Sequence, residues 1–308
     1  MENKEKGMVS AIIYLSDDAV KSTAFLEAVC KELEETFEFY EVIAVNDNRN
    51  HTAQAVRSHY ETSGRKAPLT MVNFSVRQGV ERAMNAGIDM AIGDYLFELD
   101  NVNAGLPKGL MAQCYHKSTE GYDIVCAVPE GNEKGWSRWF YRVFNRFSNS
   151  GTKVTTDGMH LLSRRAVNRL HAINSYIPYR KAAHAASGLR NAFVDYTPTE
   201  PFVSVEDDRV AKATDALILY TDAAYRLSIF IALFMLGLAV TSGIYTLAVY
   251  FAAKPVAGWT TTMAIVSTGF SGVFLLFAVV IKYLTLLVDL VFHNQKYLVA
   301  SVDKIQNN

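Results

Sequence analysis

A near-absence of charge in the last quarter of the chain constrains its fold more than any other feature. Between Arg226 and Lys282 the only charged residue is Lys254. The run 227–253 contains 27 uncharged residues and the run 263–281 contains 19. A helix rises about 1.5 Å per residue, so each run can cross the roughly 30 Å of bilayer hydrocarbon. Such runs also occur as buried helices of large soluble cores, but two in tandem around a Lys-Pro turn favour a hairpin of transmembrane helices.

The charges that flank this hairpin predict its orientation. Lysines and arginines lie on both outer sides, whereas the connecting turn carries only Lys254. The positive-inside tendency then places both termini in the cytosol, in a multi-pass protein of the cytoplasmic membrane. Residues 1–7 are charged and lack the apolar core of a secretory signal. Small residues in the two runs could let copies pack into a homo-oligomer; these are Ser242, Gly243, Gly269 and Gly272.

These features divide the chain into three expected parts. We predict a cytosolic α/β domain over 1–205, a juxtamembrane amphipathic segment over 206–226, and a two-helix transmembrane anchor with a cytosolic tail over 227–308. The formal net charge of −1 gives no electrostatic case for a nucleic-acid partner. The three cysteines lack paired or zinc-ligand spacing, so we expect reduced thiols. Seven histidines without a His-x-x-x-His pair argue against a zinc hydrolase.

The first half of the chain alternates between strand-like and helix-like segments. Strands that alternate with crossover helices predict a largely parallel sheet covered on both faces. Apolar runs that fit strands are 9–15, 40–45, 69–74, 95–99 and 121–128, and the clearest helical patterns are 52–61 and 78–92.

Two polar turns follow predicted strands, and each contains an aspartate. Asp47 follows the second strand and Asp100 follows the fourth. Ligands of parallel sheets bind at the carboxyl ends of strands. Asp47 could accept hydrogen bonds from a base or a ribose, or it could cap the next helix, which composition alone favours. Asp100 could supply an oxygen ligand to Mg²⁺ or Mn²⁺.

An aromatic and basic segment at 136–147 carries an arginine at every fourth residue, namely Arg138, Arg142 and Arg146. On a helix these arginines form one stripe beside aromatic rings. We interpret the segment as an interfacial helix on the anionic leaflet, near a lipid phosphate. A core-packing helix with a solvated basic face is the alternative.

A series of short motifs runs from 9 to 100 in a fixed order. Its members are Val45-Asn46-Asp47 with Thr52, then Gly79, Ala83, Ala86-Gly87, Ala91-Ile92-Gly93-Asp94-Tyr95 and Leu99-Asp100. The most specific part is Ala-x-Gly-Asp-Tyr with an acid five residues beyond its tyrosine. This series resembles the amino-terminal half of family 2 glycosyltransferases. Later motifs, at 121–125, 136–147, 161–165, Arg209 and the terminal hairpin, are similar to those of the polyprenyl-phosphate glycosyltransferases of that family.

The resemblance implies a GT-A-like α/β domain that moves a sugar, with inversion, from a nucleotide-diphosphate donor to polyprenyl phosphate. It implies that Asp47 contacts the nucleotide, that Asp94 borders the site, and that Asp100 binds the sugar or a Mg²⁺ or Mn²⁺ ion. Asp17 keeps an acid after the first strand, as the family does. The implied ligands of the phosphates are arginines, which bind them with bidentate hydrogen bonds; they are Arg209, Arg138 and Arg142.

Two acids of the family pattern are missing. The second acid of the Asp-x-Asp motif falls at Val102. The acid of the family's Asp-Phe-Arg-Leu segment, counted back from Arg164, falls at Gly158. Asp157, one residue earlier, joins Asp100 and Arg209 as a candidate catalytic residue. Because lost carboxylates remove strong Mg²⁺ ligands, two functions stay open. One is an active transferase with a weakened metal site; the other is a catalytically degenerate subunit that binds or scaffolds a glycan-assembly complex.

Overall fold

The computed structural model describes the residues that form a mixed α/β sheet domain and scattered positions elsewhere. The described stretches are 4–47, 52–131, 155–173, 179–201 and 297–306, with isolated positions between 142 and 287. The chain forms two compact units, of which the first comprises 1–146, 150–212 and 295–308 and the second comprises 147–149 and 213–294.

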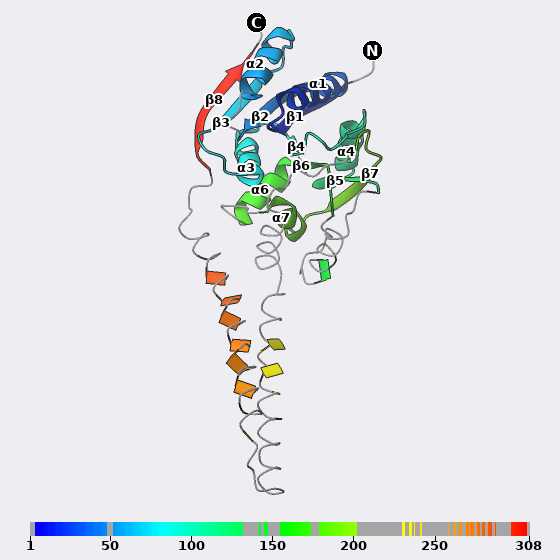
Figure 1. Ribbon diagram of the computed structural model, residues 1–308. Coiled ribbons are helices and arrows are strands. Elements are labelled where there is room, and N and C mark those ends of the chain that lie inside the picture. The colour runs from blue at the N-terminus through cyan, green and yellow to red at the C-terminus, as the bar shows by residue number, and fades with distance from the viewer. Residues whose placement is uncertain are drawn as a thin grey trace. The chain divides into compact units, whose positions relative to one another are not determined.

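The first unit contains every strand that the structure describes, together with the helices that cover them (Figure 1). The strands are β1 (Glu5–Tyr14), β2 (Phe37–Asn46), β3 (Leu69–Phe74), β4 (Tyr95–Leu99), β5 (Ile124–Pro129), β6 (Met159–Ser163), β7 (Asn191–Tyr196) and β8 (Val299–Ile305). The helices are α1 (Ala19–Thr36), α2 (Thr52–Thr62), α3 (Val80–Met90), α4 (Leu110–Thr119), α6 (Arg164–Ile173) and α7 (Arg180–Ala186).

The eight strands form one sheet in the order β7-β5-β6-β4-β1-β2-β3-β8. β1 pairs in parallel with both β2 and β4, and β2 pairs in parallel with β3. β6 runs antiparallel between β4 and β5, and β8 runs antiparallel along β3 at the edge of the sheet (Figure 1). The predicted, largely parallel sheet is therefore confirmed, with two antiparallel strands that the sequence patterns did not reveal.

The sheet is covered on both faces because its central strands are apolar on both sides. Alternate residues of β1, such as Ile13, join a core with α1, α2 and α4. The opposite side of β1 faces α3, where Gly87 packs directly on Ile12. A side chain at residue 87 would collide with that isoleucine, so glycine lets helix and sheet approach closely. This packing fixes the strand ends that carry the candidate site.

The second unit is described only at scattered positions, most of them helical. The rings of Phe230 and Phe234 stack with their centroids 6.5 Å apart. Gly272 lies against Met235, since a Cβ at residue 272 would fall 2.6 Å from the methionine Sδ. Among the described positions, no helix combines the length and apolar character needed to span a bilayer. Most of 227–281 lies outside the described residues, so the transmembrane hairpin stays a prediction.

Candidate functional site

Three of the predicted acids lie at one edge of the sheet, where parallel strands end. Asp17 follows β1, Asp47 follows β2 and Asp100 follows β4. Because these strands are parallel neighbours, their carboxyl ends meet at the same edge. Hydrogen bonds join the loops there: Thr52 Oγ1 donates to the carbonyl of Asp17 at 3.4 Å, and Lys21 Nζ donates to Asn103 Oδ1 at 3.3 Å. The expected ligand-binding edge is present.

Asp47 is buried and holds the loop that precedes α3. Its two carboxylate oxygens accept hydrogen bonds from the backbone N–H groups of Gln78 and Gly79, at 2.7 and 2.6 Å. Burial raises the pKa of Asp47, and these two backbone donors oppose the rise. In the described structure Asp47 fixes the β3–α3 loop of the edge, and its predicted contact with a nucleotide stays a prediction.

Asp100 is bound to a buried arginine that the sequence analysis did not single out. Arg180, at the start of α7, donates from Nη2 to Asp100 Oδ2 at 2.9 Å. The same guanidinium donates to Glu81 Oε2 at 2.9 Å and to Glu98 Oε2 at 3.4 Å. Arg180 is 1% exposed, so its charge is balanced almost entirely by these three carboxylates. Asp100 therefore faces an internal cation at the strand end.

Asp157 belongs to the same buried region and precedes β6, whose start pairs with the carboxyl end of β4. Its Oδ2 lies 2.8 Å from His160 Nε2, and its Oδ1 lies 2.5 Å from Lys181 Nζ. Burial alone would raise the pKa of Asp157, but His160 and Lys181 outweigh it and hold that pKa well below its usual range. Asp157 is buried with both oxygens engaged, and the catalytic role predicted for it stays a prediction. Gly158, beside it, packs against Tyr196.

The structure places Asp94 away from this edge and describes only one of the three predicted arginines. Asp94 is exposed and precedes β4, so it lies at the opposite end of that strand from Asp100. Its backbone links strands, since its N–H donates to the carbonyl of Met8 at 2.7 Å. Arg142 is helical and exposed, whereas Arg138 and Arg209 lie outside the described residues.

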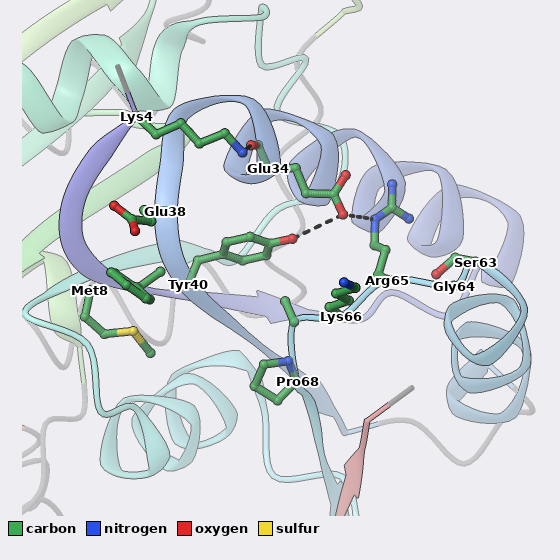
Figure 2. Close-up of a pocket in the computed structure, with 12 residues that line it drawn as sticks. Lys4, Met8, Glu34, Glu38, Tyr40, Ser63, Gly64, Arg65, Lys66 and Pro68 are labelled. Carbon is green, nitrogen blue, oxygen red and sulfur yellow. Dashed lines mark hydrogen bonds and ion pairs between the residues drawn. The ribbon is translucent and has the colours of Figure 1, made fainter. Parts of the chain in front are cut away.

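An open groove of about 760 Å³ lies at the other end of the sheet, around the start of β2 and the loop before β3. Figure 2 shows Tyr40 and Arg65 pointing toward Glu34, whose Oε1 accepts hydrogen bonds from both, at 3.2 and 2.9 Å. Arg65 also pairs with Glu27 at 2.7 Å. The arginine of this groove is thus already neutralised, and the groove lies away from the acids that follow β1, β2 and β4.

Sequence reasoning missed residues that the fold brings to the edge. Glu98 precedes Asp100 by two residues, a spacing that puts both side chains on one face of β4. The family motif places its second acid after Asp100, at Val102, and not before it. Arg77 was also missed; its Nη1 lies 3.9 Å from Asp17 Oδ2 at the edge.

The described residues do not fit a Mg²⁺ or Mn²⁺ ion at Asp100. In nucleotide sites Mg²⁺ is bound through one or two carboxylates, and waters and substrate phosphates supply its other ligands. Here the second acid of the motif is Val102, and Asp100 Oδ2 accepts a hydrogen bond from Arg180. The motif therefore offers one carboxylate, that of Asp100, and one of its two oxygens is already engaged.

Comparison with known proteins finds relatives that are described as glycosyltransferases or sugar transferases. An uncharacterized glycosyltransferase of Synechocystis sp. is 29% identical over 162 residues, 50% of each chain. A prophage bactoprenol glucosyl transferase homolog of Escherichia coli is 22% identical over 62% of this chain and 64% of its own. An undecaprenyl-phosphate 4-deoxy-4-formamido-L-arabinose transferase of Aeromonas hydrophila is 23% identical over 52% of this chain and 48% of its own. The matched regions span about half to just under two thirds of these curated relatives.

A solved structure supports the fold. The mannosyltransferase of Pyrobaculum calidifontis, in complex with GDP-Man and Mn²⁺, superposes with a TM-score of 0.53 at 15% identity, over 91% of this chain and 88% of its own. This likeness confirms the expected GT-A-like fold. The family model described as glycosyl transferase family 2 matches residues 22–184, more than half of the chain and including most of the sheet. The chain belongs to glycosyl transferase family 2.

Proposed function

We propose that this chain is a membrane-bound, inverting glycosyltransferase that moves a sugar from a nucleotide-diphosphate donor to polyprenyl phosphate. The observation that carries the proposal is the placement of Asp17, Asp47 and Asp100 at one edge of the sheet in a family 2 chain. Two curated relatives act on bactoprenol or undecaprenyl phosphate by name, which supports this acceptor class.

The donor diphosphate meets cationic side chains at the proposed edge. Arg77 lies 3.9 Å from Asp17, and Lys21 bonds to Asn103 in the loop after β4. Cations placed where the nucleotide diphosphate departs stabilise its growing negative charge. Because the described residues around Asp100 fit a divalent ion poorly, we assign this stabilisation to Lys21 and Arg77, and we expect donor binding to need no added Mn²⁺.

The acceptor in this proposal is an ionised lipid phosphate at the cytosolic face of the cytoplasmic membrane. Such a phosphate is already nucleophilic near neutral pH, so the reaction needs little help from a general base. This suits a site in which Asp157 is buried and fully engaged. Arg138, Arg142 and Arg209 remain the proposed ligands of the lipid phosphate.

The membrane anchor also belongs to the proposal. In the second unit, the described phenylalanines are largely exposed, with Phe230 at 65% and Phe270 at 61%. Exposed rings along helical, uncharged runs suit a lipid environment better than water. The contact between Gly272 and Met235 supports close packing of the two runs in a hairpin.

A second function is favoured by one observation. The carboxylate of Asp100 is paired with Arg180, and no second acid follows it at Val102. An edge of this kind suits a degenerate family member that binds a donor or a partner without catalysing sugar transfer. The two functions make different predictions for the same purified protein.

The deciding experiment uses the full chain purified in detergent. Calorimetry with UDP-, GDP- and CDP-sugars, with and without Mn²⁺, measures donor binding, and a radiolabel assay with polyprenyl phosphate measures transfer. Binding with turnover supports the transferase, and binding without turnover supports the degenerate subunit. If no nucleotide sugar binds to folded protein, the donor edge is wrongly assigned.

The anchor has its own test. Green fluorescent protein fused at the carboxyl terminus should fluoresce, because we expect that end in the cytosol. Alkaline phosphatase inserted into the turn at 254–261 should be active, because that turn is expected on the other side. The reverse pattern, or release of the intact chain by alkaline carbonate, would rule out this topology.

A further inference from the structure

Two histidines and a glutamate meet in the interior beneath Asp100. Glu98 lies on β4, His160 on β6 and His184 on α7, and all three are buried. Glu98 and His160 are register partners across the β4–β6 pair, so their side chains share one face of the sheet. One potential ligand atom from each side chain lies within 4.8 Å of the other two. The imidazole rings are T-shaped, with centroids 5.0 Å apart.

Two polar atoms of this cluster have no hydrogen-bond partner in the described structure: Glu98 Oε1 and His184 Nδ1. Glu98 is 1% exposed, and its other oxygen receives only the 3.4 Å hydrogen bond from Arg180. An unpaired polar atom in the interior costs free energy, and nearly all such atoms in native proteins have a partner. The cluster therefore needs a further group that binds the glutamate.

The spacing of the three side chains fits a metal ion. His160 Nδ1 lies 3.8 Å from Glu98 Oε2, and His184 Nε2 lies 3.8 Å from Glu98 Oε1. Zinc bonds to nitrogen and oxygen of about 2.0–2.2 Å place tetrahedral ligands roughly 3.4 Å apart. The three ligand atoms lie within 4.8 Å of one another, so a modest inward movement of the side chains would bring them onto one ion. Two imidazoles and one carboxylate form a ligand set that zinc takes in proteins.

A neighbouring carboxylate orients one of the imidazoles for this role. Asp157 Oδ2 lies 2.8 Å from His160 Nε2, and Lys181 holds the other oxygen of Asp157. A carboxylate on one ring nitrogen fixes the tautomer and directs the other nitrogen, here Nδ1, toward the metal. In the described structure Nδ1 is the nitrogen that faces Glu98.

The local charge also favours a divalent ion. Among the described residues of this interior, four carboxylates contact two basic side chains. A divalent cation would add positive charge where carboxylates outnumber basic groups. The carboxylates are those of Glu81, Glu98, Asp100 and Asp157, and the basic residues are Arg180 and Lys181.

We propose that Glu98, His160 and His184 bind one Zn²⁺ ion that links β4, β6 and α7 beneath the donor edge. This site differs from the predicted Mg²⁺ or Mn²⁺ site at Asp100, because it is buried and two of its three ligands are nitrogens. The ion has a structural role: it holds the strand end that carries Asp100 against α7.

The test begins with the tag-free full chain, purified in detergent without chelator and dialysed against micromolar Zn²⁺. Mass spectrometry of the metals should give about one zinc per chain. X-ray absorption at the zinc edge should show two imidazole ligands without any substitution in the protein. Protein that holds no zinc, or zinc without imidazole ligands, would overturn the proposal. If the purified protein holds no metal and NMR shows that His160 is protonated, a proton takes the place of the ion. That result would also overturn the proposal.

Substitution then locates the site. His184→Gln should lose the zinc and the visible absorption of the Co²⁺-loaded protein. His116→Gln is the matched control, because His116 lies on the surface of α4 with its side chain 62% exposed. The control should keep both signals. Full metal content in the His184 variant would place the ion elsewhere, and the spectrum of the unsubstituted chain decides the case if that variant does not fold.

Discussion

Tyr196 occupies the space that a side chain at residue 158 would need. The tyrosine hydroxyl donates a hydrogen bond to the carbonyl of Ala104 at 2.8 Å. A Cβ built on Gly158 would collide with that hydroxyl and would lie 3.1 Å from the ring Cζ of Tyr196. The family pattern expects an acid at this position, and here a phenol ring fills its place. The packing of Tyr196 on Gly158 therefore leaves no room for a carboxylate side chain at this position.

This contact predicts a cost for any side chain at residue 158. Gly158→Ala should lower the free energy of unfolding by about 1–3 kcal/mol, because the buried ring must shift and its hydrogen bond must stretch. In a Tyr196→Phe background the cost should shrink, since the hydroxyl that collides is gone. A double-mutant cycle followed by denaturant unfolding measures this coupling. Strictly additive costs would show that the two residues do not compete for the same space.

Substitution of Arg180 should destabilise the fold strongly. Arg180→Gln leaves Glu81, Glu98 and Asp100 together without their cation, so we expect a loss of about 3–5 kcal/mol in unfolding free energy. Arg180→Lys should not restore it, because one ammonium cannot bridge three carboxylates as a guanidinium does. Thermal unfolding in detergent is the measurement. Arg57→Gln, at an exposed pair on α2, is the control and should change stability little.

Substitution of Arg77 tests whether the edge binds the donor, and it leaves the interior undisturbed. Its side chain is 54% exposed, so Arg77→Gln should leave the fold intact. Loss of a charge-assisted hydrogen bond to the diphosphate should weaken nucleotide-sugar binding about tenfold. Calorimetry of the variant beside Arg57→Gln measures the effect. Equal affinity in both variants would remove Arg77 from the donor site.

The lowered pKa of Glu27 predicts that the stability of the fold depends on pH. Hydrogen bonds from Arg65 lower the pKa of Glu27 from 4.5 to about 2. A carboxyl with a lower pKa in the folded state stabilises the fold above its unfolded value and loses that contribution as pH falls. Glu27→Gln should therefore be less stable than wild type at pH 7, and the difference should vanish between about pH 4.5 and pH 2. Denaturant unfolding across this range, with Arg65→Gln as the partner variant, measures it; a difference independent of pH would contradict the pairing.

The thiols of the folded chain should be unreactive. Cys30, Cys114 and Cys126 are free and buried, as expected from their spacing. Burial raises the pKa of Cys30 and of Cys114 to about 12, so almost no thiolate forms at neutral pH. Ellman's reagent should label none of the three rapidly in native protein and all three after unfolding. Fast labelling of one thiol in the native state would show that its segment opens.

The sequence alone determined those strands whose residues follow a clear pattern of apolar runs between turn residues. The runs 69–74 and 95–99 are the strands β3 and β4, with the predicted bounds, because apolar residues there are flanked by turn residues. The aspartates that follow strands were found for the same reason. The charge pattern also predicted the membrane hairpin, which lies mostly outside the described residues and stays a prediction.

Only the tertiary structure decided which side chains meet. Glu98 and Arg180 are 82 residues apart in the sequence, and His160 lies between them on a strand that no pattern predicted. Their meeting depends on the register between β4 and β6 and on the packing of α7, and both are set by contacts distant in sequence. A period of two or of 3.6 residues reports which face of an element is buried. It carries no information about which other element covers that face, so the buried cluster beneath Asp100 could not be derived from the chain alone.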